Sequence, residues 1–280
     1  MIIDSLKKTI SIMREKKLLL LVIVLLQILF FFGLGFVSYI NIIPAMAHAS
    51  RAIEYFEKVG KDIGKNESQG MFGYLGDNPM IVYDNYRKMI GYLRNMGVWF
   101  LVLFLFIDGF IWTLSNRVVR KRTIIKKRLK GFVISFLRLF LLGLILAFIV
   151  YVTFLELYRS LWSGAGFASI GYLSITGIFI LFIFYFFLIG FCLIDRRFKE
   201  ILRLMFLIGF YRFPYVLLVY LINLVVVIGS GILLYFSIEK RIFVIIACII
   251  VFVFSFVFTR LFLIVVINSL ARNLIRSRRH

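Results

Sequence analysis

Six long apolar runs limit what this chain of 280 residues can fold into. They cover residues 18–43, 97–115, 131–157, 170–194, 214–236 and 242–267. Each run is at least as long as the roughly 17–20 residues that cross the hydrocarbon core of a bilayer. We therefore predict an all-α polytopic membrane protein with six transmembrane helices. The first run is longer than a signal-peptide core, and no small-residue cleavage site follows it, so we expect a retained membrane helix.

The basic residues are distributed in a way that predicts how the chain crosses the membrane. The net charge is +21, and 22 of the 34 Lys and Arg residues lie in the segments 1–17, 117–130, 195–213 and 268–280. The region 44–96 is nearly neutral, with seven basic and six acidic residues. This positive-inside pattern predicts a multi-pass protein of the cell membrane with both termini in the cytoplasm. It also explains the charge without a nucleic-acid partner.

Three basic amphipathic stretches each lead into an apolar run: "MIIDSLKKTISIMREKK", "NRVVRKRTIIKKRLKG" and "DRRFKEILRLMFLIGFYRFP". Apolar residues at helical spacing among basic ones are typical of a helix that lies in the headgroup layer. We therefore predict three cytoplasmic interfacial elbow helices that bind membrane lipids through anionic headgroups. The residues expected to contact headgroups are Lys7, Lys8, Arg120, Lys121, Arg122, Lys126, Lys127, Arg128, Arg196 and Arg197.

The elbows divide a single membrane domain, residues 1–280, into three units of one plan: 1–116, 117–194 and 195–280. The alternative is that any six-helix protein with basic inner loops gives the same pattern. The first unit carries an insertion, 44–96, which we predict to be an extracytoplasmic helical hairpin. Pro44 is expected to end or kink the first helix. Asn66 begins a formal N-glycosylation sequon on the outer side.

Three charged residues interrupt the apolar runs, and they are expected at one depth. Asp108 is nine residues from Arg117, while Arg138 and Arg260 are each eight residues from an inner end. At 1.5 Å per residue, all three lie about 12–13 Å from the inner face. A charge inside a membrane is costly unless it is paired or hydrated. This intramembrane polar cluster has three interpretations. Asp108 pairs with one of the arginines; or the arginines extend to phosphates and Asp108 is protonated or hydrated; or the cluster lines a pathway or binds an anionic headgroup.

Other polar residues in the runs are expected to join helices by hydrogen bonds. They are Gln27, Asn223 and Thr259.

The sequence contains no pattern that supports catalysis. Its two histidines, His48 and His280, have no metal-ligand neighbours, and neither a Gly-x-Ser-x-Gly motif nor a Walker loop is present. The two cysteines, Cys192 and Cys248, lie within apolar runs and are expected to be small core residues. We therefore predict a protein that is not an enzyme and has no catalytic residues, cofactor or metal site.

The three stretches "DSLKKTISIMREKK", "RKRTIIKKRLKG" and "RRFKEILRLMF" carry a resemblance to a known architecture. With the helices that follow, they resemble the six-helix membrane domains fused to some glycerophosphodiester phosphodiesterases, and the stand-alone bacterial and archaeal relatives of those domains. The resemblance covers the chain except for 44–96. The chain has no phosphodiesterase domain, so no catalytic residue carries over.

The N-terminal elbow, the six helices and the long first outer loop also resemble permease subunits of type-2 ABC exporters. This second resemblance implies that the loop 117–130 would dock a separate ATPase.

These observations lead to three functional hypotheses. The first is a non-enzymatic membrane protein of transporter-like or lipid-interacting type. The second is an exporter permease subunit that works with an ATPase. The third is a membrane scaffold whose 44–96 insertion binds an external subunit.

Overall fold

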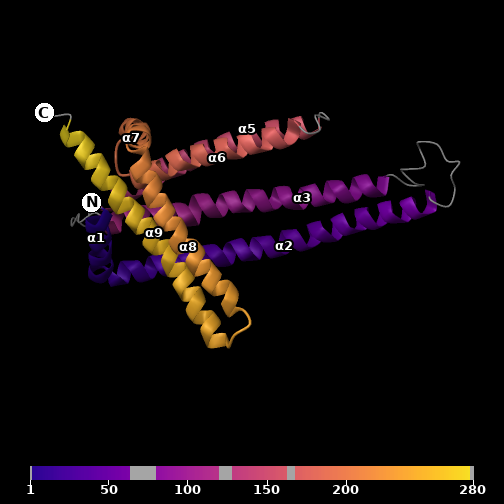
Figure 1. Ribbon diagram of the computed structural model, residues 1–280, viewed down its shortest axis with the longest axis horizontal. Coiled ribbons are helices and arrows are strands. Elements are labelled where there is room, and N and C mark those ends of the chain that lie inside the picture. The colour runs from indigo at the N-terminus through magenta and orange to yellow at the C-terminus, as the bar shows by residue number, and fades with distance from the viewer. Residues whose placement is uncertain (1, 64–79, 120–127, 163–167, 278–280) are drawn as a thin grey trace. The chain divides into compact units, whose positions relative to one another are not determined.

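The computed structural model describes residues 2–63, 80–119, 128–162 and 168–277, and within these ranges every regular element is helical (Figure 1). In chain order the elements are α1 (Ile2–Glu15), α2 (Lys17–Ile63), α3 (Met80–Leu103), the π-helical segment η2 (Phe104–Asp108), α4 (Gly109–Val119), α5 (Arg128–Trp162), α6 (Ala168–Cys192), α7 (Phe198–Tyr211), α8 (Phe213–Ser237) and α9 (Ile242–Ser277).

Six helical stretches within the described residues are long and apolar enough to cross a membrane. They are Lys17–Val59, Met80–Val119, Lys130–Thr153, Ser174–Cys192, Phe213–Ser237 and Ile242–Ile275. Each contains one of the six apolar runs or most of it, so the structure has six candidate membrane-spanning helices at the positions that the sequence predicts.

The surface of these helices is apolar where a water-soluble protein would be polar. Phe32, Leu181 and Phe243 are 71%, 69% and 80% exposed, and many other large apolar side chains are exposed with them. Exposure of so much apolar surface to water is unfavourable, whereas lipid chains are as apolar as these side chains. The exposed side chains are therefore consistent with a protein embedded in a bilayer.

The chain forms two compact units, Leu29–Phe104 and Met1–Ile28 with Leu105–His280. In the unit Leu29–Phe104, α2 continues through Pro44 to Ile63, so the proline does not end the helix. A proline removes one backbone hydrogen bond, which membrane helices tolerate because local adjustments satisfy the freed carbonyl. The whole of α2 has 47 residues and is about 70 Å long, well beyond the roughly 30 Å of hydrocarbon in a bilayer. One crossing of the hydrocarbon therefore does not require the whole of α2.

Two amide contacts join α2 to α3 in this unit. Asn95 Nδ2 donates to Asn41 Oδ1 at 2.9 Å, and the Asn41 amide donates to the Val37 carbonyl one turn earlier. His48 Nδ1 lies 2.8 Å from Asn85 Oδ1, and the Asn85 amide donates to Ile81 O. Because Asn85 presents its oxygen, Nδ1 of His48 must carry the proton. Asn41 and Asn85 thus each donate to a carbonyl of their own helix and accept a hydrogen bond from the facing helix. The part of the insertion between these helices, residues 64–79 with Asn66, lies outside the described residues.

The second unit is built around α4 and the C-terminal half of α9, which pack against each other. Seven of the eleven residues of α4 are buried, and so is the stretch of α9 from Leu261 to Ile267. Helices α1, α5, α6 and α7 surround them. A helix buried on several sides must satisfy its polar groups within the protein, which matters for the site described below.

Helices α8 and α9 form a long antiparallel pair in the same unit (Figure 1). The Asn223 amide of α8 donates to the Thr259 carbonyl of α9 at 3.3 Å, and the hydroxyls of Ser230 and Ser255 are 2.8 Å apart. Asn223 therefore makes the kind of interhelical contact that the sequence predicts for it. The hydroxyl of Thr259 bonds within its own helix, to Phe256 O.

Two of the three predicted elbows fall on described helices, α1 and α7, which precede α2 and α8 directly. The remaining elbow was predicted over residues 117–130. Most of this segment, residues 120–127, lies outside the described residues. The buried residues of α1 are Ser5, Thr9 and Ile12, and this helix packs against α9 and α4. The apolar stripe that the sequence predicts for this helix consists of Ile2, Ile3, Leu6, Ile10 and Met13. Of these, Ile3, Leu6 and Ile10 are exposed, whereas Ile2 and Met13 are half-buried. Ser5, Thr9 and Ile12 therefore face the protein, whereas Ile3, Leu6 and Ile10 face outward.

Gly209 of α7 allows the close approach of α6. A Cβ atom at Gly209 would lie 2.3 Å from Cε1 of Phe186, a ring that is only 5% exposed. Phe186 also contacts the rings of Phe182, Phe206 and Phe210, so moving it aside would disturb these contacts. The glycine is therefore required by packing.

We expect Gly209→Ala to destabilise the protein by about 1–3 kcal/mol, because overpacking forces ring and backbone shifts. Thermal unfolding in nanodiscs would measure this as a lower melting temperature. Gly229→Ala in α8 is the matched control, since nothing lies within 4 Å of a Cβ atom there. Equal melting temperatures for the two variants would contradict the packing role of Gly209.

Candidate functional site

Asp108 and Arg260 form a buried ion pair. Nη2 of Arg260, on α9, donates to Oδ1 of Asp108, at the end of η2, over 2.5 Å. The side chains of Arg260 and Asp108 are only 9% and 8% exposed. A charge in such surroundings is costly alone, and pairing offsets most of that cost. The structure therefore brings together one acid and one of the two arginines considered from the sequence.

The ring of Trp112 completes the surroundings of this pair. Its centroid lies 5.0 Å from Cζ of Arg260, and the side chain follows Asp108 by one turn of the helix. A guanidinium over an indole face is attracted by the ring quadrupole, more strongly when water is excluded. Asp108 and Trp112 thus hold Arg260 from one helical face. Trp112 was not among the residues expected from the sequence, although its i+4 spacing from Asp108 was a usable signal.

The backbone at Asp108 is π-helical rather than α-helical, over Phe104–Asp108. Single π-helical turns are uncommon and occur frequently at functional sites. Leu105 of this segment is buried, and a Cβ atom at Gly143 of α5 would lie 2.5 Å from its side chain. Gly143 therefore provides the space that the wider turn needs.

Arg138 has other partners than Asp108. Its Nη1 atom donates to the carbonyl of Arg196 at 2.5 Å and approaches that of Ile194 at 3.5 Å. Ser135, one turn earlier on α5, donates to Asp195 Oδ1 at 2.9 Å. Both residues of α5 therefore hold the turn that connects α6 to α7.

Two asparagines donate hydrogen bonds to the last carbonyl groups of α6, where the helix end is buried in the protein. Asn116 Nδ2 of α4 donates to Phe191 O at 2.9 Å, and Asn268 Nδ2 of α9 donates to Cys192 O at 3.2 Å. Each also donates to the carbonyl four residues before it on its own helix. The last carbonyls of a helix have no partner within the helix, so these contacts replace water. Neither asparagine was expected from the sequence, where the only signal was an amide near the end of an apolar run.

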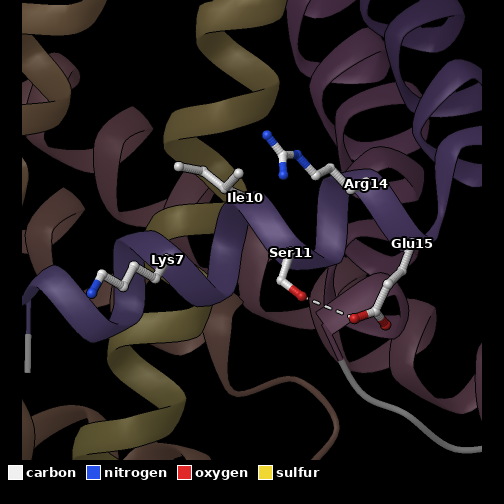
Figure 2. A pocket seen from close by; sticks show the side chains of 5 residues that line it. All are labelled: Lys7, Ile10, Ser11, Arg14 and Glu15. Carbon is white, nitrogen blue, oxygen red and sulfur yellow. Dashed lines mark hydrogen bonds between the residues drawn. The ribbon is translucent and has the colours of Figure 1, made fainter.

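A shallow hollow on α1 is lined by two basic residues, one acidic residue, a serine and an isoleucine: Lys7, Arg14, Glu15, Ser11 and Ile10 (Figure 2). The Ser11 hydroxyl donates to Glu15 Oε1 at 2.9 Å. Figure 2 shows Arg14 and Ile10 projecting from one side of the helix and the Ser11–Glu15 contact from another. Lys7 and Arg14 are both exposed. The hollow thus combines two exposed cations and one exposed carboxylate, that of Glu15, with an exposed apolar side chain.

The remaining residues expected to contact headgroups are only partly described. Lys8 and Arg197 are exposed, and Arg196 is half-buried with its Nε atom buried. Arg120, Lys121, Arg122, Lys126 and Lys127 lie outside the described residues, as does the side chain of Arg128.

No group of three or more His, Cys, Asp or Glu side chains that could hold a metal ion occurs in the part of the chain that the structure describes. Both cysteines are free thiols; Cys192 is buried and Cys248 is half-buried.

Comparison with family models, with curated proteins and with solved structures finds no match for this chain. The fold itself is consistent with one class, an integral membrane protein, because the described residues contain six helices long and apolar enough to cross a membrane.

We expect Asp108→Asn to lower the melting temperature by about 10 °C, because breaking a buried pair leaves the charge of Arg260 uncompensated. The charge-reversed double variant Asp108→Arg/Arg260→Asp should recover part of this loss. Asp84→Asn, at an exposed site on α3, is the control and should leave the melting temperature unchanged. A melting temperature of Asp108→Asn equal to that of the wild type would exclude a structural role for the pair.

Proposed function

We propose that this protein is a lipid-interacting membrane protein that binds anionic phospholipid headgroups through α1. The observation that carries the proposal is the hollow of α1, where Lys7 and Arg14 are exposed beside Ile10. Lipid phosphates are the abundant anions next to a membrane protein, and they attract such residues by about 1 kcal/mol per Lys or Arg.

The faces of α1 support a position in the headgroup layer. Its buried residues, Ser5, Thr9 and Ile12, face the protein, while Ile3, Leu6 and Ile10 remain exposed at helical spacing. An exposed apolar stripe is unfavourable in water and favourable at the boundary of the acyl chains. With the stripe directed toward the acyl chains, the neighbouring cations reach the level of the phosphates. The protein contact, the apolar stripe and the basic side chains thus suit one orientation.

Helix α7 has a comparable division of faces. Its buried residues are Ile201, Leu204, Met205, Ile208 and Gly209. Phe206 and Phe210 are 50% and 60% exposed, and Lys199 and Arg203, one turn apart, are exposed as well. Both α1 and α7 also contact α9. The second helix therefore supports the same type of interaction, an anionic lipid held at the membrane surface beside the protein.

The test is native mass spectrometry of the full chain, released from nanodiscs that contain phosphatidylglycerol and phosphatidylcholine. We expect the wild type to retain phosphatidylglycerol preferentially. The double variant Lys7→Ser/Arg14→Ser should bind it about 30-fold more weakly, from about 1 kcal/mol for each lost cation. Neither side chain is buried, so the fold should be preserved.

Lys240→Ser/Arg241→Ser, which removes two exposed cations at the turn between α8 and α9, is the matched control. It should retain as much phosphatidylglycerol as the wild type. Equal loss in both double variants, or no preference for the anionic lipid, would refute the proposal. A stoichiometric ATPase or external subunit released with the protein would instead favour the permease or scaffold hypothesis.

A further inference from the structure

Arg260 has a second nitrogen that the ion pair does not use. Nη2 donates to Asp108, whereas Nη1 is buried and has no hydrogen-bond partner among the described residues. The whole residue is 9% exposed, so bulk solvent does not reach this atom freely. A buried donor without a partner costs about as much as a lost hydrogen bond, and such atoms commonly bind an ordered water molecule.

Gln27 presents the complementary group. Its side chain is 1% exposed, and its Oε1 atom is a buried acceptor without a partner in the described part of the chain. Gln27 belongs to the same compact unit as Asp108 and Arg260. The two unpartnered atoms are therefore of opposite type, one donor and one acceptor.

A single contact fixes the depth of Gln27 relative to Asp108. Lys16, the turn residue between α1 and α2, donates through Nζ to Val118 O of α4 at 2.7 Å. Gln27 follows Lys16 by 11 residues and Asp108 precedes Val118 by 10, which correspond to about 16 Å and 15 Å along the two helices. The Leu20 amide donates to the Lys16 carbonyl at 3.0 Å, so the helical bonding of α2 reaches back to Lys16. Eleven residues at about 100° each are close to three full turns, which places Gln27 on the side of α2 that Lys16 begins. Gln27 thus lies at the level of the ion pair and faces the side on which Lys16 meets α4.

The charge of the pair determines which ligand can join these atoms. Asp108 and Arg260 together are neutral, so an added anion or cation would bring a net charge into a low-dielectric interior. A neutral molecule that accepts from Nη1 and donates to Oε1 avoids this cost. Water meets both requirements and is small enough for a closely packed site.

We propose that a water molecule bridges Arg260 Nη1 and Gln27 Oε1, so that Gln27, Asp108 and Arg260 form one hydrated polar site inside the membrane-spanning core. The site is separate from the hollow on α1, and it does not depend on lipid binding.

The first test is a double-mutant cycle read by thermal unfolding in nanodiscs. Gln27→Leu is measured in the wild type and in the Asp108→Leu/Arg260→Met background, where the pair is replaced by apolar side chains. In the wild type it should lower the melting temperature by about 5 °C, because Nη1 loses its bridge. In the apolar background it should have no effect or raise the melting temperature. Equal changes in both backgrounds would overturn the proposal.

Asn41→Leu provides the matched control. Asn41 is an equally buried amide further along α2, and its partner is Asn95. Its effect should be the same in both backgrounds, which shows that the coupling belongs to Gln27 and is not a general response to the apolar pair.

The second test does not require the apolar background to fold. An experimental map at a resolution that shows ordered water should contain density within hydrogen-bond distance of both atoms in the wild type. The same density should be absent in Gln27→Leu. A wild-type map in which Gln27 and Arg260 are too far apart for one bridging water, or in which no density joins them, would overturn the proposal.

Discussion

The enclosed C-terminal end of α6 is the constraint on which the larger unit depends. Residues Phe191–Ile194 are at most 1% exposed, so the last carbonyl groups of this helix cannot bond to water. Donors from α4, α5 and α9 reach the helix end and the turn after it, through Asn116, Arg138 and Asn268. Because a carbonyl without a partner is costly in apolar surroundings, these bonds fix the depth of three helices relative to α6.

Four asparagines of this protein bond both within their own helix and to a neighbouring helix. Asn41, Asn85, Asn116 and Asn268 each donate to the carbonyl four residues earlier, so their orientation is fixed by their own helix. Asn41 and Asn85 then offer an oxygen to the neighbouring helix, whereas Asn116 and Asn268 share their amide with a second carbonyl. Between membrane helices, where lipid supplies no hydrophobic driving force, such contacts and close packing supply specificity.

The ion pair and the faces of α1 show which parts of a site can be predicted from the sequence. Depth along a helix follows from counting residues, so the sequence alone places Asp108, Arg138 and Arg260 at one level. Counting does not give the direction in which each side chain points relative to other helices, and this direction separates Arg138 from Arg260. The π-helical turn at Asp108 further shifts the helical register, and no residue pattern in Phe104–Asp108 indicates it. For α1 the pattern revealed an amphipathic helix, but the residues that it buries against the protein, Ser5, Thr9 and Ile12, became evident only from packing.

The sequence by itself determined the class of this protein, because six runs of apolar residues long enough to cross a bilayer leave few alternatives to membrane-spanning helices. It also narrowed the possible partners of Asp108 to two arginines. Only the tertiary structure decided that Arg260 is the partner, that Trp112 covers it, and that Arg138 and two asparagines hold the end of α6. The physical reason is that hydrophobicity acts locally and is readable residue by residue. Hydrogen bonds and ion pairs between helices instead depend on the rotation and packing of segments distant in the chain.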